Sequence, residues 1–320
     1  MPINADKPRL WKADTRASVD QFNQWFTTYA PKAYRDTRRK TVDHVKQGFT
    51  ATADLTNITP EAIQQSPGVL PTLRMCTCPP LARDRLIGLA DSTKNLVGSL
   101  EKGKLPPRTS PKLLAEHLQR IAHTLSSMLD ADIFPWLEEK RRPTKEERYR
   151  SSTIVADRLC GAVAEPIVRN AQERRQLGMI EGYLTKHGYT RKSHPAGKPL
   201  QEMEPGTFSF RLNVRVKKTP RSAKTTNIPG DVVIQPKKAK LPHLPIIIEA
   251  KSAGDFTNVN KRRKEEAAKM AQLKATYGRR IRFILFLCGY FDAPYLGYEA
   301  AEGIDWVWEH RIEDLDRLGL

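Results

Sequence analysis

Apolar side chains recur at helical spacing through the first half of the chain. Residues 19–29 carry four apolar side chains three or four positions apart, and Pro31 follows directly, which predicts a helix that ends near this proline. Ser110 before Pro111 predicts a helix start, with a leucine and isoleucine stripe behind it. A helical pair is expected over about 150–187, closed by Gly188.

The period changes to strand spacing from residue 207, where apolar and polar side chains alternate through residue 216. Four further strands are predicted: one begins at Asp231, one leads into Glu249, and two span 282–288 and 305–309. Helices are predicted over about 258–277 and 313–318. This order predicts an α/β (α+β) fold with a mixed central sheet flanked by helices. The charged, proline-broken residues 140–145 are typical of a linker, so we expect a helical N-terminal region (1–145) and a second domain (146–320).

Positive charge is strong and uneven along the chain. The net charge is +18, and residues 211–280 hold 18 Lys and Arg against 5 Asp and Glu. Such a field favours a polyphosphate partner, and a membrane surface is the lesser alternative because the basic residues do not fall on one amphipathic helix. No apolar run is long enough for a bilayer span and no secretory leader is present, so we expect an intracellular, cytoplasmic protein whose four cysteines are reduced.

The acidic residues inside this basic stretch carry the candidate chemistry. Asp231 follows Pro229 and Gly230, and Glu249 and Lys251 lie eighteen and twenty positions later on a second apolar run. Residues i and i+2 of a strand share a face, so Glu249 and Lys251 point together and Asp231 can join them from the adjacent strand. Two carboxylates there suit Mg²⁺ and a phosphodiester, and the ammonium can orient water or stabilise charge. The alternative is a strand-end salt bridge beside a turn aspartate.

Two further groups of residues are candidates for binding. The predicted helix start at 258–264 unites a cap, a helix N-terminus and four cations, which favours DNA contact over a solvated helix start. The residues expected to touch DNA are Asn258, Asn260, Lys261, Arg262, Arg263 and Lys264. For a third acidic ligand from a helix before the sheet, we select Glu173 over Glu165 and Glu181, the alternative being a salt-bridged surface helix.

These residues resemble a known group of enzymes. Asp231 with Glu249-x-Lys251 resembles the PD-(D/E)XK nuclease superfamily, although Gly230 separates the proline from the aspartate. The stretch around them, 248–258 continuing through 261–266, resembles the XamI-type family of type II restriction endonucleases. Other stretches that resemble this family lie at 33–38, 167–175, 205–210 and 305–310.

The resemblance implies a Mg²⁺-dependent homodimer with a PD-(D/E)XK core that cuts double-stranded DNA at a palindrome, expected to be GTCGAC, and leaves four-base 5′ ends. It implies that Asp231 and Glu249 bind the metal, that the Ala250 carbonyl is a further ligand, and that Lys251 is the catalytic lysine. A companion DNA methyltransferase is expected as a genetic partner. The alternatives are a repair or junction-resolving nuclease on the same fold and a non-catalytic DNA-binding protein.

Overall fold

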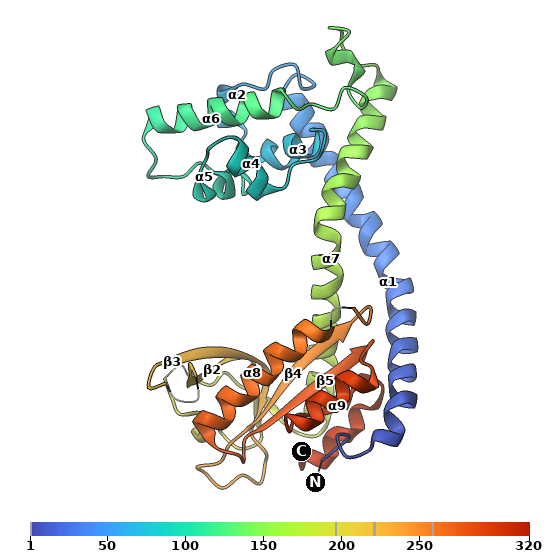
Figure 1. Cartoon of the computed structure of the whole chain (residues 1–320), viewed down its shortest axis with the longest axis vertical. Helices are drawn as coiled ribbons and strands as arrows, with labels where there is room; N and C mark the ends of the chain where they lie inside the picture. The colour runs from blue at the N-terminus through green and yellow to red at the C-terminus, as the bar shows by residue number, and fades with distance from the viewer. Residues whose placement is uncertain (1, 196, 220–221, 258) are drawn as a thin grey trace. The chain divides into compact units, whose positions relative to one another are not determined.

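The computed structural model describes residues 2–195, 197–219, 222–257 and 259–320, and gives only the backbone of 162–165 and 259–262. The chain forms two compact units (Figure 1): Met1–Tyr29 with Val168–Leu320, and Ala30–Ile167. We call them the sheet unit and the helical unit. This division differs from the boundary expected after residue 145, because residues 1–29 pack with the sheet and the chain returns to it only at residue 168.

The helical unit is built around its own apolar core, which includes Phe49, Leu118, Ile121, Phe134 and Trp136. Ser110 caps a helix as expected, since its hydroxyl accepts the Leu113 amide proton at 3.4 Å. The helices that contribute to this unit are α1 (Pro8–Ala51), α2 (Pro60–Gln65), α3 (Leu70–Met75), α4 (Arg83–Leu89), α5 (Lys94–Leu100), α6 (Pro111–Ser126) and α7 (Lys145–Lys186), with short 3₁₀ turns at Pro67–Val69 and Pro135–Leu137.

Two expectations about helix boundaries are wrong. Helix α1 continues through Pro31, and the helical pair expected at 150–187 is the single helix α7, which contains Pro166. A proline removes one backbone hydrogen bond and bends a helix, but the turns on either side keep theirs. No helix in the described part of the chain is both long and apolar enough to cross a membrane.

The sheet unit contains one six-stranded mixed sheet, as expected, with its strands in sequence order. The strands are β1 (Thr190–Arg191), β2 (Thr207–Lys217), β3 (Thr225–Ile234), β4 (Ile246–Ala253), β5 (Arg282–Gly289) and β6 (Asp305–Trp308). Strand β3 is antiparallel to both of its neighbours, β2 and β4, whereas β4, β5 and β6 are parallel. Strands β4 and β5 are apolar runs buried on both faces, which places them in the middle of the sheet.

Helices cover both faces of this sheet (Figure 1). The C-terminal half of α7 packs Ile180 and Leu184 against one face, in a cluster with Ile248. Helices α8 (Val259–Tyr277) and α9 (Ala293–Ala301) cover the other face, where Met270 and Leu273 pack in a second cluster. Helix α9 was not anticipated, and the helix expected at 313–318 is part of a 3₁₀ segment, η4 (Glu309–Leu318). A short 3₁₀ turn at Leu200–Glu202 precedes β2.

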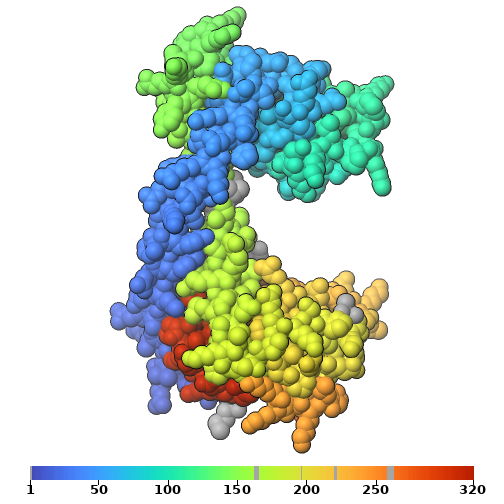
Figure 2. Space-filling view, turned by 180° about the vertical axis from the view of Figure 1, so that it is seen from behind, coloured from blue at the N-terminus to red at the C-terminus, as the bar shows by residue number. Residues whose placement is uncertain are grey.

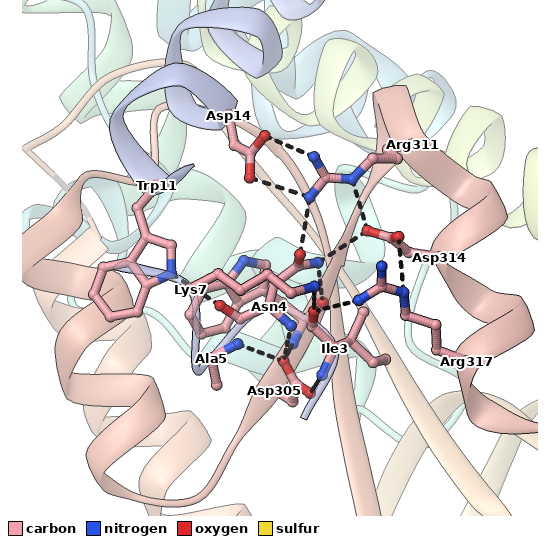
Figure 3. A network of polar contacts seen from close by, with 11 residues as sticks. Ile3, Asn4, Ala5, Lys7, Trp11, Asp14, Asp305, Arg311, Asp314 and Arg317 are labelled. Atoms are coloured by element: carbon pink, nitrogen blue, oxygen red, sulfur yellow. Dashed lines mark hydrogen bonds and ion pairs between the residues drawn. The ribbon is translucent and has the colours of Figure 1, made fainter. Parts of the chain in front are cut away.

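The first residues of the chain are fastened to the last strand (Figure 3). The Asp305 carboxylate accepts the amide protons of Asn4 and Ala5, both at 3.0 Å, and that of Ile3. The Asn4 side chain donates to the Trp306 carbonyl at 2.9 Å. Because these contacts join residues about 300 positions apart, both ends of the chain belong to the sheet unit.

Candidate active site

Asp231 lies on β3 directly beside β4. The ladder pairs Val232 with Ile248, so Asp231 is the next position on β3 and faces Glu249 across the strands. Strand β3 begins at Thr225, so Asp231 lies inside the strand and not at its start as expected. Its Oδ2 accepts the Ala250 amide proton at 2.8 Å. Burial, followed by the nearby Glu249 carboxylate, raises the pKa of Asp231 to about 6.

Glu249 and Lys251 share one face of β4, as the spacing of two residues predicts. The Lys251 ammonium lies 3.0 Å from Oε1 of Glu249, and the Glu249 side chain is buried. Lys269 on α8 donates to the same oxygen. The other oxygen, Oε2, is buried and has no hydrogen-bond partner among the described residues. The structure thus brings Asp231, Glu249 and Lys251 together. We propose a catalytic role for these three residues under Proposed function and call them the catalytic trio.

A second acidic group lies behind Lys251 and was missed from the sequence. Glu266 on α8 is fully buried, with Oε1 3.7 Å from the Lys251 ammonium and Oε2 accepting the Tyr295 hydroxyl proton at 2.6 Å. Burial lowers the pKa of Lys251, but Glu249 and Glu266 outweigh it, so the net pKa is raised. Burial and the charge of Glu266 raise the pKa of Glu299 to about 9. The only sequence signal was an acidic residue within the basic helix start.

Helix α7 fixes the ends of the central strands. Gln176 donates to the carbonyl oxygens of Lys251 and Phe286, each at 3.3 Å, and so ties β4 to β5 at the catalytic trio. Glu173, one turn earlier, binds Arg211 on β2 at 2.7 Å. The described contacts of Glu173 include neither Asp231 nor Glu249, although a helix-borne acidic ligand was expected at this residue.

The residues expected to contact DNA begin helix α8. Asn258 lies outside the described residues, and Asn260, Lys261 and Arg262 are described by backbone alone. The Arg263 guanidinium stacks on the ring of Tyr298 at 3.7 Å from its centroid, while Lys264 is exposed. Arg263 therefore packs against α9 in the free protein.

The donor atoms of the site suit a hard divalent cation. Asp231 and Glu249 supply oxygen ligands. The Oε2 atom of Glu249 is buried without a hydrogen-bond partner among the described residues, and a bound cation would offset the cost of burying it. The backbone amide and carbonyl of a strand residue point to the same neighbouring strand. Because the Ala250 amide binds Asp231 on β3, the Ala250 carbonyl also points toward β3. No group of three or more His, Cys, Asp or Glu side chains among the described residues is placed to hold a metal, so a cation here depends on this carbonyl and on solvent or substrate oxygens.

Comparison with known proteins places the chain in a family. The model of the XamI restriction endonuclease family matches residues 53–308, which include all three members of the catalytic trio. The chain belongs to the XamI restriction endonuclease family. The family match begins inside the helical unit, so both compact units share in it.

Two curated relatives support membership of the XamI restriction endonuclease family. The type II restriction enzyme SalI of Streptomyces albus G is 56% identical over 317 residues, which cover 99% of each chain. The type II restriction enzyme XamI of Xanthomonas campestris pv. amaranthicola is 26% identical over 231 residues, which cover 68% of this chain and 73% of the relative. No solved structure matches the chain significantly.

Proposed function

We propose that this protein cuts both strands of duplex DNA at GTCGAC, using the catalytic trio with Mg²⁺. Family membership carries the reaction class: the chain is a type II restriction endonuclease. The observation that supports the assignment of the reaction to these residues is the convergence of Asp231, Glu249 and Lys251 on two adjacent strands. The site GTCGAC comes from the family resemblance.

Asp231, Glu249 and the Ala250 carbonyl would hold Mg²⁺, which neutralises phosphate charge and lowers the pKa of a bound water. Burial, followed by the nearby Glu249 carboxylate, raises the pKa of Asp231, so a cation bound by both carboxylates would offset this cost. Lys251 keeps its proton in this acidic setting, so it acts as a cation that orients the attacking water and stabilises charge on the phosphate.

Bond making and breaking follow from these positions. The water oxygen bonds to phosphorus in line with the departing 3′ oxygen and releases a proton to solvent, the P–O3′ bond breaks, and the 3′ oxygen takes up a proton from solvent. The products are a 5′-phosphate and a 3′-hydroxyl. Glu249 lies 3.0 Å from the Lys251 ammonium and would hold that ammonium beside the scissile bond.

Binding to DNA is assigned to the start of helix α8 and the surrounding positive charge. Asn258, Asn260, Lys261, Arg262, Arg263 and Lys264 form the proposed contact segment, and the net charge of +18 supports a polyanionic partner. A palindromic site suits a two-fold homodimer in which each subunit cuts one strand. We further propose that the enzyme works in the bacterial cytoplasm and is encoded with a protective DNA methyltransferase.

Digestion of a long sequenced duplex, with Mg²⁺ and with EDTA, tests this function when the new ends are mapped. Mg²⁺-dependent ends at GTCGAC alone are expected. Ends at another palindrome would contradict the site but keep the class. Cuts confined to branched DNA would favour a structure-specific nuclease, and tight binding without cleavage would leave a non-catalytic DNA-binding protein.

A further inference from the structure

Arg211 has an unusual backbone conformation beside the catalytic trio. Its φ is +51°, a left-handed value that costs residues other than glycine about 1–2 kcal/mol. The ladder of β2 and β3 pairs Phe210 with Val232 and Leu212 with Gly230, so Arg211 lies opposite Asp231. The ladder does not pair Arg211 with Asp231 themselves. A strained residue therefore lies opposite Asp231 in the ladder of β2 and β3, and its side chain reaches Glu173 on α7.

The strained conformation turns β2 over. Phe208 packs with Ile234 in the cluster on the α7 face, whereas Val214 and Val216 pack with Val233 on the α8 face. Even-numbered residues of a regular strand share one face, so β2 reverses its faces between Phe208 and Val214. Glycine would allow this reversal without the energetic cost, so the backbone alone does not account for an arginine.

The contacts of the Arg211 side chain do not repay the strain either. Its guanidinium binds Glu173 at 2.7 Å, but the two side chains are 67% and 35% exposed. Exposed ion pairs contribute about 0–1 kcal/mol, which is less than the backbone cost. Figure 2 shows the C-terminal half of α7 at the surface in yellow-green, beside the yellow segment that contains β2. The pair is thus open to a large ligand.

We propose that Arg211 binds a backbone phosphate of the DNA next to the scissile bond, and that Glu173 occupies its guanidinium in the free protein. The inference rests on the proposed function. A guanidinium forms two parallel hydrogen bonds with a phosphate, so a phosphodiester can replace the Glu173 carboxylate as its partner. Glu173 then competes with substrate for Arg211, which gives it a role other than metal ligation.

The variant R211G separates this role from folding. Glycine keeps the reversed strand and removes the strain, so the unfolding temperature is expected to stay level or rise. Single-turnover cleavage of a GTCGAC duplex with Mg²⁺ is expected to fall about 100-fold, in the range for loss of one donor group at a transition state. R211K keeps the charge but lacks the planar fork, and is expected to fall between R211G and wild type.

A matched ion pair on the same helix provides the control. Arg191 on β1 binds Glu181 on α7 at 3.2 Å, with similar exposures of 61% and 40%. R191A and E181Q remove comparable surface charges without touching the residue opposite Asp231, and are expected to cleave at about the wild-type rate. E173Q is expected to cleave faster than wild type at low DNA concentration, because Arg211 is released from its competing partner.

The direct readout uses duplexes in which one phosphate at a time is a neutral methylphosphonate, with Ca²⁺ in place of Mg²⁺. Wild type should lose affinity at the contacted phosphate, and R211G should lose nothing further there, since the interaction is already absent. Wild-type cleavage by R211G, or equal sensitivity of both proteins at every phosphate, would overturn the assignment of Arg211. A large fall in E173Q cleavage would overturn that of Glu173.

These outcomes are distinct from failure of the proposed function. Wild-type protein that leaves the GTCGAC duplex intact overturns both proposals. Wild-type protein that cuts it while R211G cuts equally well overturns only the inference about Arg211.

Discussion

The balance of charge around single side chains governs the catalytic trio. Asp231 and Glu249 face one another across two strands, and Lys251 and Lys269 both bind Glu249. Buried groups of like charge destabilise the fold, whereas each ammonium offsets part of that cost. Replacing Asp231 is therefore expected to raise stability while it lowers activity, whereas replacing Lys251 is expected to lower both.

The variant D231N is expected to stabilise the metal-free protein at neutral pH. The pKa of Asp231 rises from its ordinary value of 3.8 to about 6 on folding. Its stabilising contribution is therefore complete below pH 3.8 and is lost as the pH rises through 6. Unfolding in EDTA should show D231N more stable than wild type by about 1–3 kcal/mol at pH 7.5. Equal stability at pH 4 is the control, and equal stability at pH 7.5 would contradict the raised pKa.

Glu266 is expected to position Lys251, although it touches neither metal ligand in the described contacts. E266Q removes one of two carboxylates beside the ammonium, so kcat should fall about tenfold while KM for DNA stays constant. E266D should recover part of the rate. Y295F, which removes the hydroxyl donor to Glu266, should have a smaller effect in the same direction. A change in KM alone would refute a positioning role.

Among the elements, the tight packing of β3 against β4 sets where Asp231 lies. A Cβ on Gly230 would meet the Cγ2 atoms of Ile247 at 3.1 Å and Val233 at 3.2 Å. The absent side chain therefore leaves room for the Ile247 and Val233 side chains directly before Asp231. This explains why a glycine separates the proline from the aspartate in the sequence.

We expect G230A to reduce both stability and cleavage. Crowding against Ile247 and Val233 should cost about 1–3 kcal/mol, and displacement of Asp231 should slow cleavage further. The control is G182A on α7, where nothing lies within 4 Å of the added carbon. A glycine-to-alanine change in a helix stabilises by about 0.5–1 kcal/mol. Normal stability of G230A in denaturant unfolding would be inconsistent with the close approach.

Most elements of the sheet unit could be predicted from the sequence, because runs of β-branched residues and the alternation of apolar and polar residues are visible within a few positions. The spacing of Glu249 and Lys251 likewise fixes their common face before any tertiary contact is known. Arg211 and Glu266 could not be predicted, since a left-handed residue within a strand and an inward-facing acid on a basic helix depend on packing. Helix α1 was misjudged because Pro31 was taken as a stop, and α7 is one helix where a helical pair was expected.

For the whole molecule, the chain ends meet in the sheet unit. Asp14 and Asn4 both bind Arg311, and Asn4 also reaches Trp306, so residues near the start hold the last strand and η4 in place (Figure 3). The SalI relative aligns over 99% of both chains, so this terminal segment lies within the shared sequence. Helix α1 contributes its residues up to Tyr29 to the sheet unit and its later residues to the helical unit.

The variant N4A is expected to destabilise the sheet unit by about 2 kcal/mol, because buried partners lose their hydrogen bonds. Denaturant unfolding followed by tryptophan fluorescence would report it, since Trp11 and Trp306 lie next to the network. N170A, at an exposed position of α7, should change stability by no more than about 0.5 kcal/mol. Equal midpoints for N4A and wild type would show that the terminal network contributes nothing.

The most direct test of the central claim is single-turnover cleavage of one GTCGAC duplex by wild type and K251A, with binding measured in parallel. Wild type should cut in Mg²⁺ and not in EDTA. K251A should bind the duplex normally and cut at least about 100-fold more slowly. Cleavage by K251A at the wild-type rate would contradict the assignment of the catalytic trio.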